Sequence, residues 1–239
     1  MEIHYYDRLE STNDLAKKAA LEGAAPLYTV VAKSQSGGVG RMGRSFSSPV
    51  GGTYFSVVLR PSFDRARFGA ITPFCAVAVH RALLELTGTS TDIKWINDLL
   101  LDGKKVCGIL ATSGIDQEGN AFVIVGIGIN TGEGALPPEI RDIATTLPYG
   151  DIPRLVKCIL SYLGDFEREI ERGTWLEYYK AHASCLGRPV TVIRGGERVN
   201  AVALDIDAEG GLSVRFENGN EETLRGGEIS LRLGAFMAQ

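Results

Sequence analysis

A loop rich in glycine and arginine carries the first residues whose types and spacing could do chemistry. It contains Gly37-Gly38-Val39-Gly40-Arg41-Met42-Gly43-Arg44. Glycines let a backbone turn sharply and present N–H groups to an anion. The guanidinium groups of Arg41 and Arg44 suit phosphate or carboxylate. The spacing is neither that of a Walker loop nor a dinucleotide fingerprint, because no Gly-Lys-Ser/Thr follows and the loop leads into a strand. Alone, the loop fits an anion site or a flexible surface loop.

A second cluster lies in Lys94-Trp95-Ile96-Asn97-Asp98 and the following Lys104-Lys105. Strand alternation predicts that Lys94, Ile96 and Asp98 share one face and that Trp95 and Asn97 share the other. A lysine, an amide and a carboxylate at strand ends could position a nucleotide with its magnesium. Without other information, however, Lys104-Lys105 is better explained as a charged hairpin turn.

Glycines also alternate in Gly126-Ile127-Gly128-Ile129-Asn130. In a strand both glycines lie on one face and leave room against it. A ligand lying flat over that face and close backbone packing explain this pattern equally well.

Periodicity predicts the elements that must position these segments. Ser11-Thr12-Asn13-Asp14 offers helix-capping side chains, and the helix should end near Gly23. The 33–52 loop is poor in apolar residues, so we expect it to be mobile until something binds. Asp102-Gly103 is a hairpin signal. Strands are expected over 28–32, 53–59, 93–101, 105–111 and 122–130, and helices over 68–87, 152–171 and 175–184.

The texture of the sequence changes at Gly187-Arg188-Pro189. Short β-rich runs follow, separated by Gly195-Gly196, Gly210-Gly211 and Asn218-Gly219. This rhythm predicts a small closed β-barrel. We therefore expect a large domain over residues 1–185 and a small domain over residues 186–239.

Composition excludes several classes of protein. The net charge of −4 gives no reason to expect bulk nucleic-acid binding. The four cysteines contain no Cys-x-x-Cys pair, so we expect reduced thiols rather than a zinc site or a disulfide framework. The first residues do not form a signal peptide, and no apolar run reaches the roughly 20 residues of a membrane span. The expected location is the cytoplasm.

In order along nearly the whole chain, these stretches resemble the biotin–protein ligase family, also called biotin–[acetyl-CoA-carboxylase] ligases. One such motif would be weak, but several in the family's order are specific. The matching segments are Ser11-Thr12-Asn13, Gln35, Gly38 to Arg44, Ser48-Pro49, Gly51, Lys94 to Asp98, Lys105, Gly108 to Leu110, Gly126 to Asn130 and Gly226 to Arg232.

The resemblance implies an α+β fold, with a mixed-sheet catalytic domain of the class II synthetase-like biotin–lipoate ligase type and a C-terminal SH3-like barrel. It also implies a reaction in two steps. The carboxylate of biotin attacks the α-phosphate of ATP, giving biotinyl-5′-AMP and pyrophosphate. A specific lysine of a biotin carboxyl carrier protein then attacks the mixed anhydride, and AMP leaves.

Roles for single residues come from the same resemblance. Lys105 and Arg41 are the implied catalytic cations, and Asp98 is the candidate ligand for Mg²⁺. The implied nucleotide-binding residues are Arg41, Arg44, Phe46, Asn97 and Asn130. The implied biotin-binding residues are Ser11, Thr12, Asn13, Gln35, Val39, Gly40, Arg41, Lys105, Gly108, Gly126 and Gly128.

Three positions depart from the family pattern. Val39 stands where the family usually has arginine, Ile96 replaces the usual proline, and Phe46 replaces a common tryptophan. Val39 removes one cationic contact from the loop. The chain also starts directly at the catalytic domain, so we expect no DNA-binding helix-turn-helix.

Several alternatives stay open at this point. A lipoate–protein ligase shares the broad fold and the adenylation chemistry, and a non-catalytic biotin sensor is a rival of another class. The C-terminal barrel either stabilises the catalytic domain or brings Glu228 and Arg232 back to the nucleotide or the carrier. The chain is compatible with a monomer or a homodimer.

Overall fold

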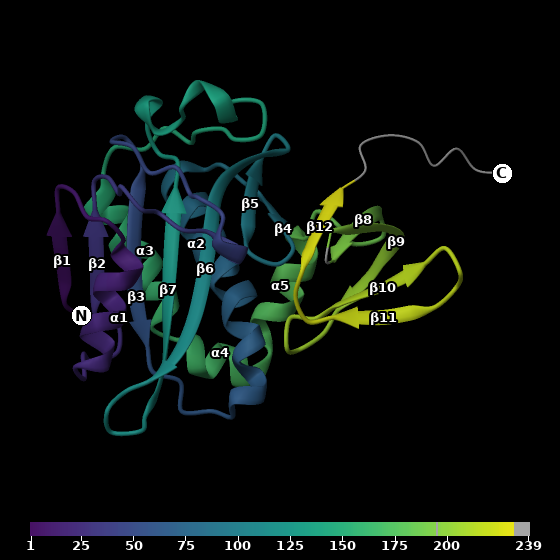
Figure 1. Cartoon of the computed structure of the whole chain (residues 1–239), viewed down its shortest axis with the longest axis horizontal. Coiled ribbons are helices and arrows are strands. Elements are labelled where there is room, and N and C mark those ends of the chain that lie inside the picture. The colour runs from purple at the N-terminus through teal and green to yellow at the C-terminus, as the bar shows by residue number, and fades with distance from the viewer. Residues whose placement is uncertain (195, 232–239) are drawn as a thin grey trace.

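A seven-stranded mixed sheet organises the larger part of the chain, in a computed structural model that describes residues 1–194 and 196–231 (Figure 1). β1 and β2 pair in parallel and the other neighbouring strands pair antiparallel. The mixed sheet of the expected fold is therefore confirmed. In spatial order the strands are β1 (Ile3–Tyr6), β2 (Thr29–Ala32), β3 (Thr53–Leu59), β7 (Ala121–Ile129), β6 (Lys104–Ile115), β5 (Asp98–Leu101) and β4 (Asp92–Lys94).

Helices cover the two faces of this sheet unequally (Figure 1). One face packs on α2 (Ile71–Thr87), with α3 (Ile152–Leu163), α4 (Phe166–Arg172) and α5 (Thr174–His182) packed around it. The other face carries α1 (Thr12–Leu21), which contacts β2, β3 and β7. Strand alternation explains the division, because Val57 joins the large core and its neighbour Val58 joins the cluster beneath α1.

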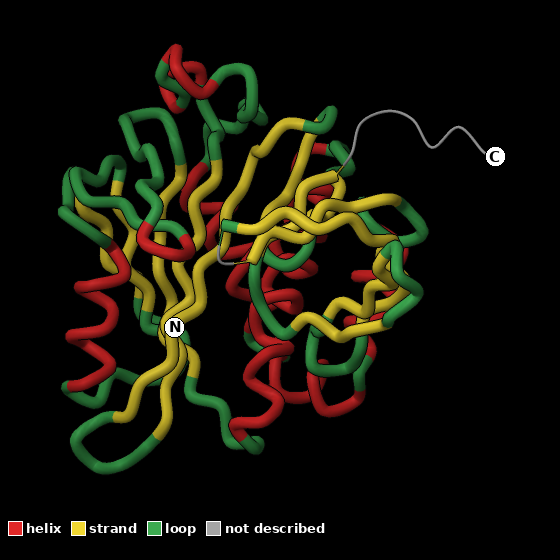
Figure 2. The backbone as a smooth tube through the Cα atoms, turned by 45° about the vertical axis from the view of Figure 1, so that its right-hand side comes forward, coloured by secondary structure: helices red, strands yellow, loops and turns green. Residues whose placement is uncertain are grey.

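The C-terminal strands form a separate five-stranded antiparallel sheet, consistent with an SH3-like domain. Figure 2 shows these strands wrapping into a rounded body beside the helices. In spatial order they are β11 (Glu221–Leu224), β10 (Leu212–Phe216), β9 (Glu197–Ile206), β8 (Pro189–Arg194) and β12 (Glu228–Leu231).

Trp95 and Lys180 make two of the contacts that fasten the C-terminal sheet to the larger part. The indole nitrogen of Trp95 donates to the carbonyl oxygen of Gly210 at 2.9 Å in a buried position. The ammonium group of Lys180, on α5, lies 2.7 Å from a carboxylate oxygen of Asp205, on β9. Trp95 belongs to the second cluster of the sequence, so the cluster is attached directly to the C-terminal body.

The prediction of one strand over residues 93–101 was wrong. The chain forms β4, turns through residues 95–97 and returns as β5, so that Lys94 lies opposite Asp98. The peptide bond between Trp95 and Ile96 is cis. Trp95 and Asn97 therefore belong to a turn, and the assignment of these residues to alternate strand faces does not hold.

The single helix expected over residues 152–171 is two helices, α3 and α4. The amphipathic pattern continues across the junction, but Gly164 ends α3 and Asp165 leaves the helical conformation. Glycine is among the poorest helix formers, which makes this the natural place for a break. The Asp102-Gly103 hairpin is confirmed, because both residues have positive φ between β5 and β6.

α2 and the turn before it are apolar enough to resemble a membrane span. Residues Arg65–Thr87 pass that test by length and hydropathy, and 67% of the apolar window is buried inside the protein. In this fold the segment is the central core helix. The cysteines at positions 75, 107, 158 and 185 are free thiols, as expected.

His80 generates a prediction about acid stability. Its ring is fully buried on α2 and Nδ1 lies 3.0 Å from the hydroxyl of Tyr178. Burial, and then the neighbouring His182, lower the pKa of His80 from 6.5 to about 4. The unfolded chain therefore binds more protons between these values, and stability falls as the pH drops below 6.5.

We expect the free energy of unfolding of the wild type to fall by about 2 kcal/mol between pH 7 and pH 5 from this group alone. Urea titrations at both pH values measure it. His80→Asn keeps a polar partner for Tyr178 but cannot titrate, so the fall in its free energy of unfolding should be smaller by the same amount. An identical pH dependence in the two proteins would contradict the assignment.

Candidate functional site

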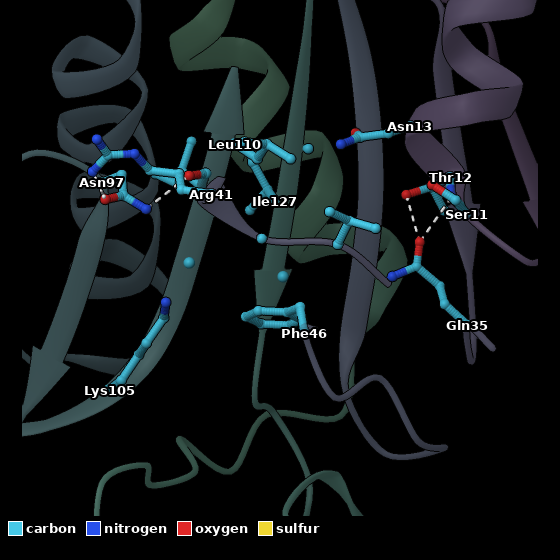
Figure 3. A pocket seen from close by; sticks show the side chains of 16 residues that line it. Ser11, Thr12, Asn13, Gln35, Arg41, Phe46, Asn97, Lys105, Leu110 and Ile127 are labelled. Carbon is cyan, nitrogen blue, oxygen red and sulfur yellow. Dashed lines mark hydrogen bonds between the residues drawn. The ribbon is translucent and has the colours of Figure 1, made fainter. Parts of the chain in front are cut away.

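A pocket opens on the α1 side of the sheet, where the two chemical clusters of the sequence meet (Figure 3). Its floor is formed by β6 and β7, and its walls by the start of α1, the 33–52 loop and the 95–97 turn. The lining residues are Ser11, Thr12, Asn13, Gln35, Val39, Gly40, Arg41, Phe46, Asn97, Lys105, Gly108, Ile109, Leu110, Gly126, Ile127 and Gly128.

A β-bulge in β6 places Lys105 over the floor. The pairing with β5 shifts register, so that Leu99 faces Cys107 but Leu100 faces Lys105. Val106 is the additional residue, and Val106 and Cys107 both point into the core. Lys105 and Gly108 consequently share a face, and a Cβ on Gly108 would lie 2.9 Å from the Lys105 Nζ.

One end of the pocket is a neutral hydrogen-bonding cluster around Gln35 and Thr12 (Figure 3). The Gln35 Oε1 accepts from the backbone nitrogen of Thr12 at 2.8 Å and from its hydroxyl at 2.9 Å. The Gln35 Nε2 donates to the hydroxyl of Ser48 at 3.0 Å. Ser11 caps α1 through a bond from the Asp14 backbone nitrogen, which confirms the predicted cap.

Ser56 supports this cluster and was not predicted from the sequence. Its hydroxyl lies 2.7 Å from that of Thr12 and 2.6 Å from the Asn13 Oδ1, and the residue is fully buried in β3. A lone serine within the apolar run Thr53–Leu59 is the signal that could have found it, because a buried hydroxyl needs a partner.

The other end of the pocket holds two cations from distant segments. The Arg41 Nη1 donates to the Asn97 Oδ1 at 3.0 Å. The Asn97 Nδ2 donates to the Asp98 Oδ1 at 3.0 Å, and the same oxygen lies 2.8 Å from the Lys105 Nζ. A continuous chain of polar contacts thus joins Arg41 to Lys105. Figure 3 shows both side chains on the same side of Phe46.

The glycine-rich loop is a small hairpin. The Phe46 nitrogen donates to the Gly38 carbonyl at 2.8 Å and the Gly40 nitrogen to that of Arg44 at 2.7 Å. Met42 and Gly43 make the turn with φ of 57° and 73°. This geometry presents Arg41 near the tip and Phe46 at the base. The expected mobility of the loop stays a prediction.

The floor glycines accept side chains of the protein itself. Phe46 covers Gly108 and Gly128, where added Cβ atoms would meet its ring, and Asn13 covers Gly126. The Lys105 Nζ lies 5.6 Å from the centre of the Phe46 ring, within cation–π range. Phe46 and Asn13 thus occupy the space that the missing side chains of these glycines leave, and the expected contact of the glycines with a ligand stays a prediction.

Three residues of the predicted site lie outside the pocket lining. Asn130 is only 5% exposed, and its amide donates to the Thr145 carbonyl at 3.1 Å, so it fastens the loop after β7. Asp98 contributes through Lys105, and Arg44 is an exposed residue of the loop. The contacts expected for Glu228 and Arg232 fall outside the described residues and side chains.

The carboxylate expected to hold Mg²⁺ is already engaged. Asp98 receives Lys105 and Asn97 on one oxygen. Among the described residues, no three histidine, cysteine, aspartate or glutamate side chains gather around a common point. Mg²⁺ commonly needs only one or two carboxylates when phosphates supply the other ligands, so the residues fit an ion that arrives with a nucleotide better than a resident one.

Comparison with known proteins identifies the family. Residues 5–130 match the Biotin/lipoate A/B protein ligase family, and residues 185–232 match the Biotin protein ligase C terminal domain. The chain belongs to the biotin/lipoate protein ligase family.

Individual relatives agree with this assignment. The chain is 30% identical to a biotin–[acetyl-CoA-carboxylase] ligase of Paracoccus denitrificans, over 90% of this chain and 94% of that protein. It is 40% identical to the bifunctional ligase/repressor BirA of Bacillus subtilis, over 60% of this chain but only 45% of that protein. The chain thus matches less than half the length of the Bacillus relative.

A solved structure shows the same arrangement of elements. The biotin protein ligase of Aquifex aeolicus, in complex with biotin and ATP, superimposes with a TM-score of 0.80 at 26% identity. The match covers 98% of this chain and 99% of that one. The fold class expected from the sequence is therefore confirmed for both parts of the chain.

The packing of Phe46 on Gly128 generates a prediction. Gly128→Ala adds a methyl group against the ring, so the base of the loop must shift and the hairpin should loosen. We expect trypsin to cleave after Arg41 or Arg44 at least about threefold faster than in the wild type, because cleavage follows local opening. Gly150→Ala is the matched control, since no atom lies within 4 Å of its added Cβ. Equal cleavage rates in all three proteins would show that Phe46 does not hold the loop.

Proposed function

We propose that this chain is an ATP-dependent biotin–protein ligase, which activates biotin to biotinyl-5′-AMP and transfers it to a lysine of a biotin carboxyl carrier protein. The observation that carries the proposal is the convergence of Arg41 and Lys105 at one end of a pocket whose other end is neutral and rich in hydrogen-bonding groups. Named ligases among the relatives support it.

The first step brings two anions together, a carboxylate and the α-phosphate of ATP. Cations fixed before the reaction stabilise the charge that develops between them. Lys105 stands over the floor and Arg41 on the loop, so the α-phosphate would lie between them. The Lys105 ammonium must exchange Asp98 for the substrate oxygens, and Asn97 keeps Asp98 in place meanwhile.

The neutral end suits the ureido head group of biotin, which offers both donors and an acceptor. Thr12, Gln35 and Asn13 supply complementary polar atoms there, with Ser56 and Ser48 holding them. The apolar ring system and tail would then run along the floor beside Gly108, Gly126 and Gly128, once Phe46 and Asn13 have moved aside from these glycines. Phe46 provides an aromatic face beside the nucleotide.

The loop has a second task in this proposal. The mixed anhydride is prone to hydrolysis, so the 33–52 loop would close over it until the acceptor lysine arrives. The carrier lysine attacks the biotinyl carbonyl, and AMP leaves with the bonding electrons of the anhydride. Mg²⁺ would come with ATP as the counter-ion of its phosphates, and Asp98 is the candidate carboxylate that would help to hold it.

The remaining expectations belong to the same proposal. Four free thiols agree with a reducing cytoplasm. The net charge of −4 gives direct DNA binding no support. The domain division near residue 186 and the choice between monomer and homodimer are also carried forward as predictions.

Lipoate is the rival substrate, because the family model covers both acids. The polar cluster at Gln35 and Thr12 favours the ureido group, since lipoate has only a disulfide there. A non-catalytic biotin sensor is the rival from another class. Arg41 and Lys105, the two cations expected to be catalytic, are both present, which favours an enzyme.

Lys105→Ala should lower the rate of adenylate formation by at least about 100-fold, because a fixed cation at the reacting oxygens is lost. Release of labelled pyrophosphate from ATP, with biotin or lipoate as the acid, measures it. Lys104→Ala is the matched control, since Lys104 is exposed and donates to the Arg141 carbonyl. Equal rates for Lys105→Ala and wild type would refute the assignment, and pyrophosphate release with lipoate alone would support the rival ligase.

Arg41→Gly should release the adenylate before transfer. Free biotinyl-5′-AMP acylates any accessible lysine, so labelling should spread from the carrier to bystander proteins such as serum albumin. Blotting of both proteins with labelled streptavidin measures the ratio, and the wild type sets the baseline. Labelling still confined to the carrier would show that Arg41 does not retain the intermediate.

A further inference from the structure

The C-terminal sheet reaches Arg41 through a backbone carbonyl. The Arg41 Nη2 donates to the oxygen of Gly227 at 2.9 Å, while Nη1 donates to Asn97 at 3.0 Å. Gly227 lies just before β12, 186 positions further along the chain. Hydrogen bonds to a guanidinium are charge-assisted and directional. The loop cation is therefore held from two sides, by the 95–97 turn and by the C-terminal body.

The two groups that accept hydrogen bonds from Arg41, Asn97 and Gly227, are both attached to the C-terminal body. Trp95, two residues before Asn97, is bonded to Gly210 of the C-terminal sheet. The turn that supplies Asn97 is thus fixed to the body that supplies Gly227. Any displacement of that body would move both acceptors relative to the loop.

The carbonyl of Gly227 can hold its position only because residue 227 is a glycine. Its φ is 111°, a value that residues with a side chain rarely adopt. A larger residue would force a different φ and carry the carbonyl oxygen away from Arg41. Gly226, its neighbour, has no such restriction, and an added Cβ there would meet no atom within 4 Å.

We propose that Gly227 is a positioning residue: its carbonyl holds Arg41, and with it the loop, so that the C-terminal domain sets how long the activated intermediate stays bound. This inference rests on the proposed function. It assigns the small domain a part in the reaction through a main-chain atom.

Retention of the adenylate and formation of the adenylate depend on different contacts. Lys105 is held by Asp98, which in turn is held by Asn97, and none of these contacts passes through Gly227. Arg41 would also keep its bond to Asn97, so loss of the Gly227 contact should leave adenylate formation within about twofold of wild type. Release of the adenylate should become about tenfold faster, the low end for a hydrogen bond to a charged group because Asn97 still holds Arg41.

The test uses Gly227→Ala in the full chain. Adenylate is formed from radiolabelled biotin with MgATP, chased with unlabelled biotin, and the protein-bound label is followed by rapid filtration. Gly226→Ala controls for a methyl group at this segment. Gly219→Ala controls for strain in the same domain, because Gly219 has a φ of 85° and its added Cβ meets no atom within 4 Å. Both controls should keep the wild-type half-life.

A wild-type half-life in Gly227→Ala would overturn the inference, and so would equal shortening in Gly219→Ala. In the Arg41→Gly background, Gly227→Ala should add nothing, since Gly227 acts through Arg41. Additive effects would contradict that route. Absence of any biotin adenylate in the wild type would overturn the proposed function and the inference with it, whereas equal retention in all variants overturns the inference alone.

Discussion

Asn97 and Asp98 balance two cations that would otherwise repel each other at the mouth of the pocket. Their amide and carboxylate bridge Arg41 to Lys105 in a single line of contacts. The Asn97 amide also donates to the Ile109 carbonyl at 3.0 Å, which pins the 95–97 turn to the pocket floor. Charges this close to an apolar core need partners to offset desolvation. The turn, the loop and β6 are therefore fixed relative to one another by the same few atoms.

That balance constrains the fold around it. Lys105 faces the pocket because Val106 is an extra residue in β6, and this bulge follows shortly after the hairpin at Asp102-Gly103. On the far side of Lys105, the backbone of Ile143 and Thr145 takes the place of a neighbouring strand, with hydrogen bonds of 2.9 Å. Asn130 holds that segment in turn. Asn130 thus supports the backbone beside Lys105 from a buried position, and its expected contact with the nucleotide stays a prediction.

Local patterns in the sequence predict many of the helices, strands and turns, but they miss the features that depend on how strands pair. The Ser11 cap, the Asp102-Gly103 turn and the β-rich C-terminal runs follow from side-chain chemistry over a few residues, and they were found. The break at 95–97 was not, because Ile93 to Leu101 is apolar enough for one strand and only its pairing with itself reveals the turn. Gly164 divides a helix whose amphipathic pattern continues on both sides.

The same limit applies to the pocket. Most residues expected there do meet, because the family pattern orders them, but regular alternation would have put Lys105 and Gly108 on opposite faces. Ser56 lies between apolar residues of β3, so its partner on α1 could not be read from local sequence.

The contact between Arg41 and Gly227 joins residues so far apart that no local pattern could indicate it. Every residue has a backbone carbonyl, so the glycine at position 227 is the one signal in the sequence. The tip of the loop is fastened by Arg41 to Asn97 and to Gly227, and the start of the loop is bonded to the backbone of Tyr6 and Leu9. The opening of the tip should therefore depend on the C-terminal body as well as on the hairpin itself. This division suits an enzyme that must hold a reactive anhydride and yet admit a protein lysine, since the tip can open while Asp98 keeps its contact with Lys105.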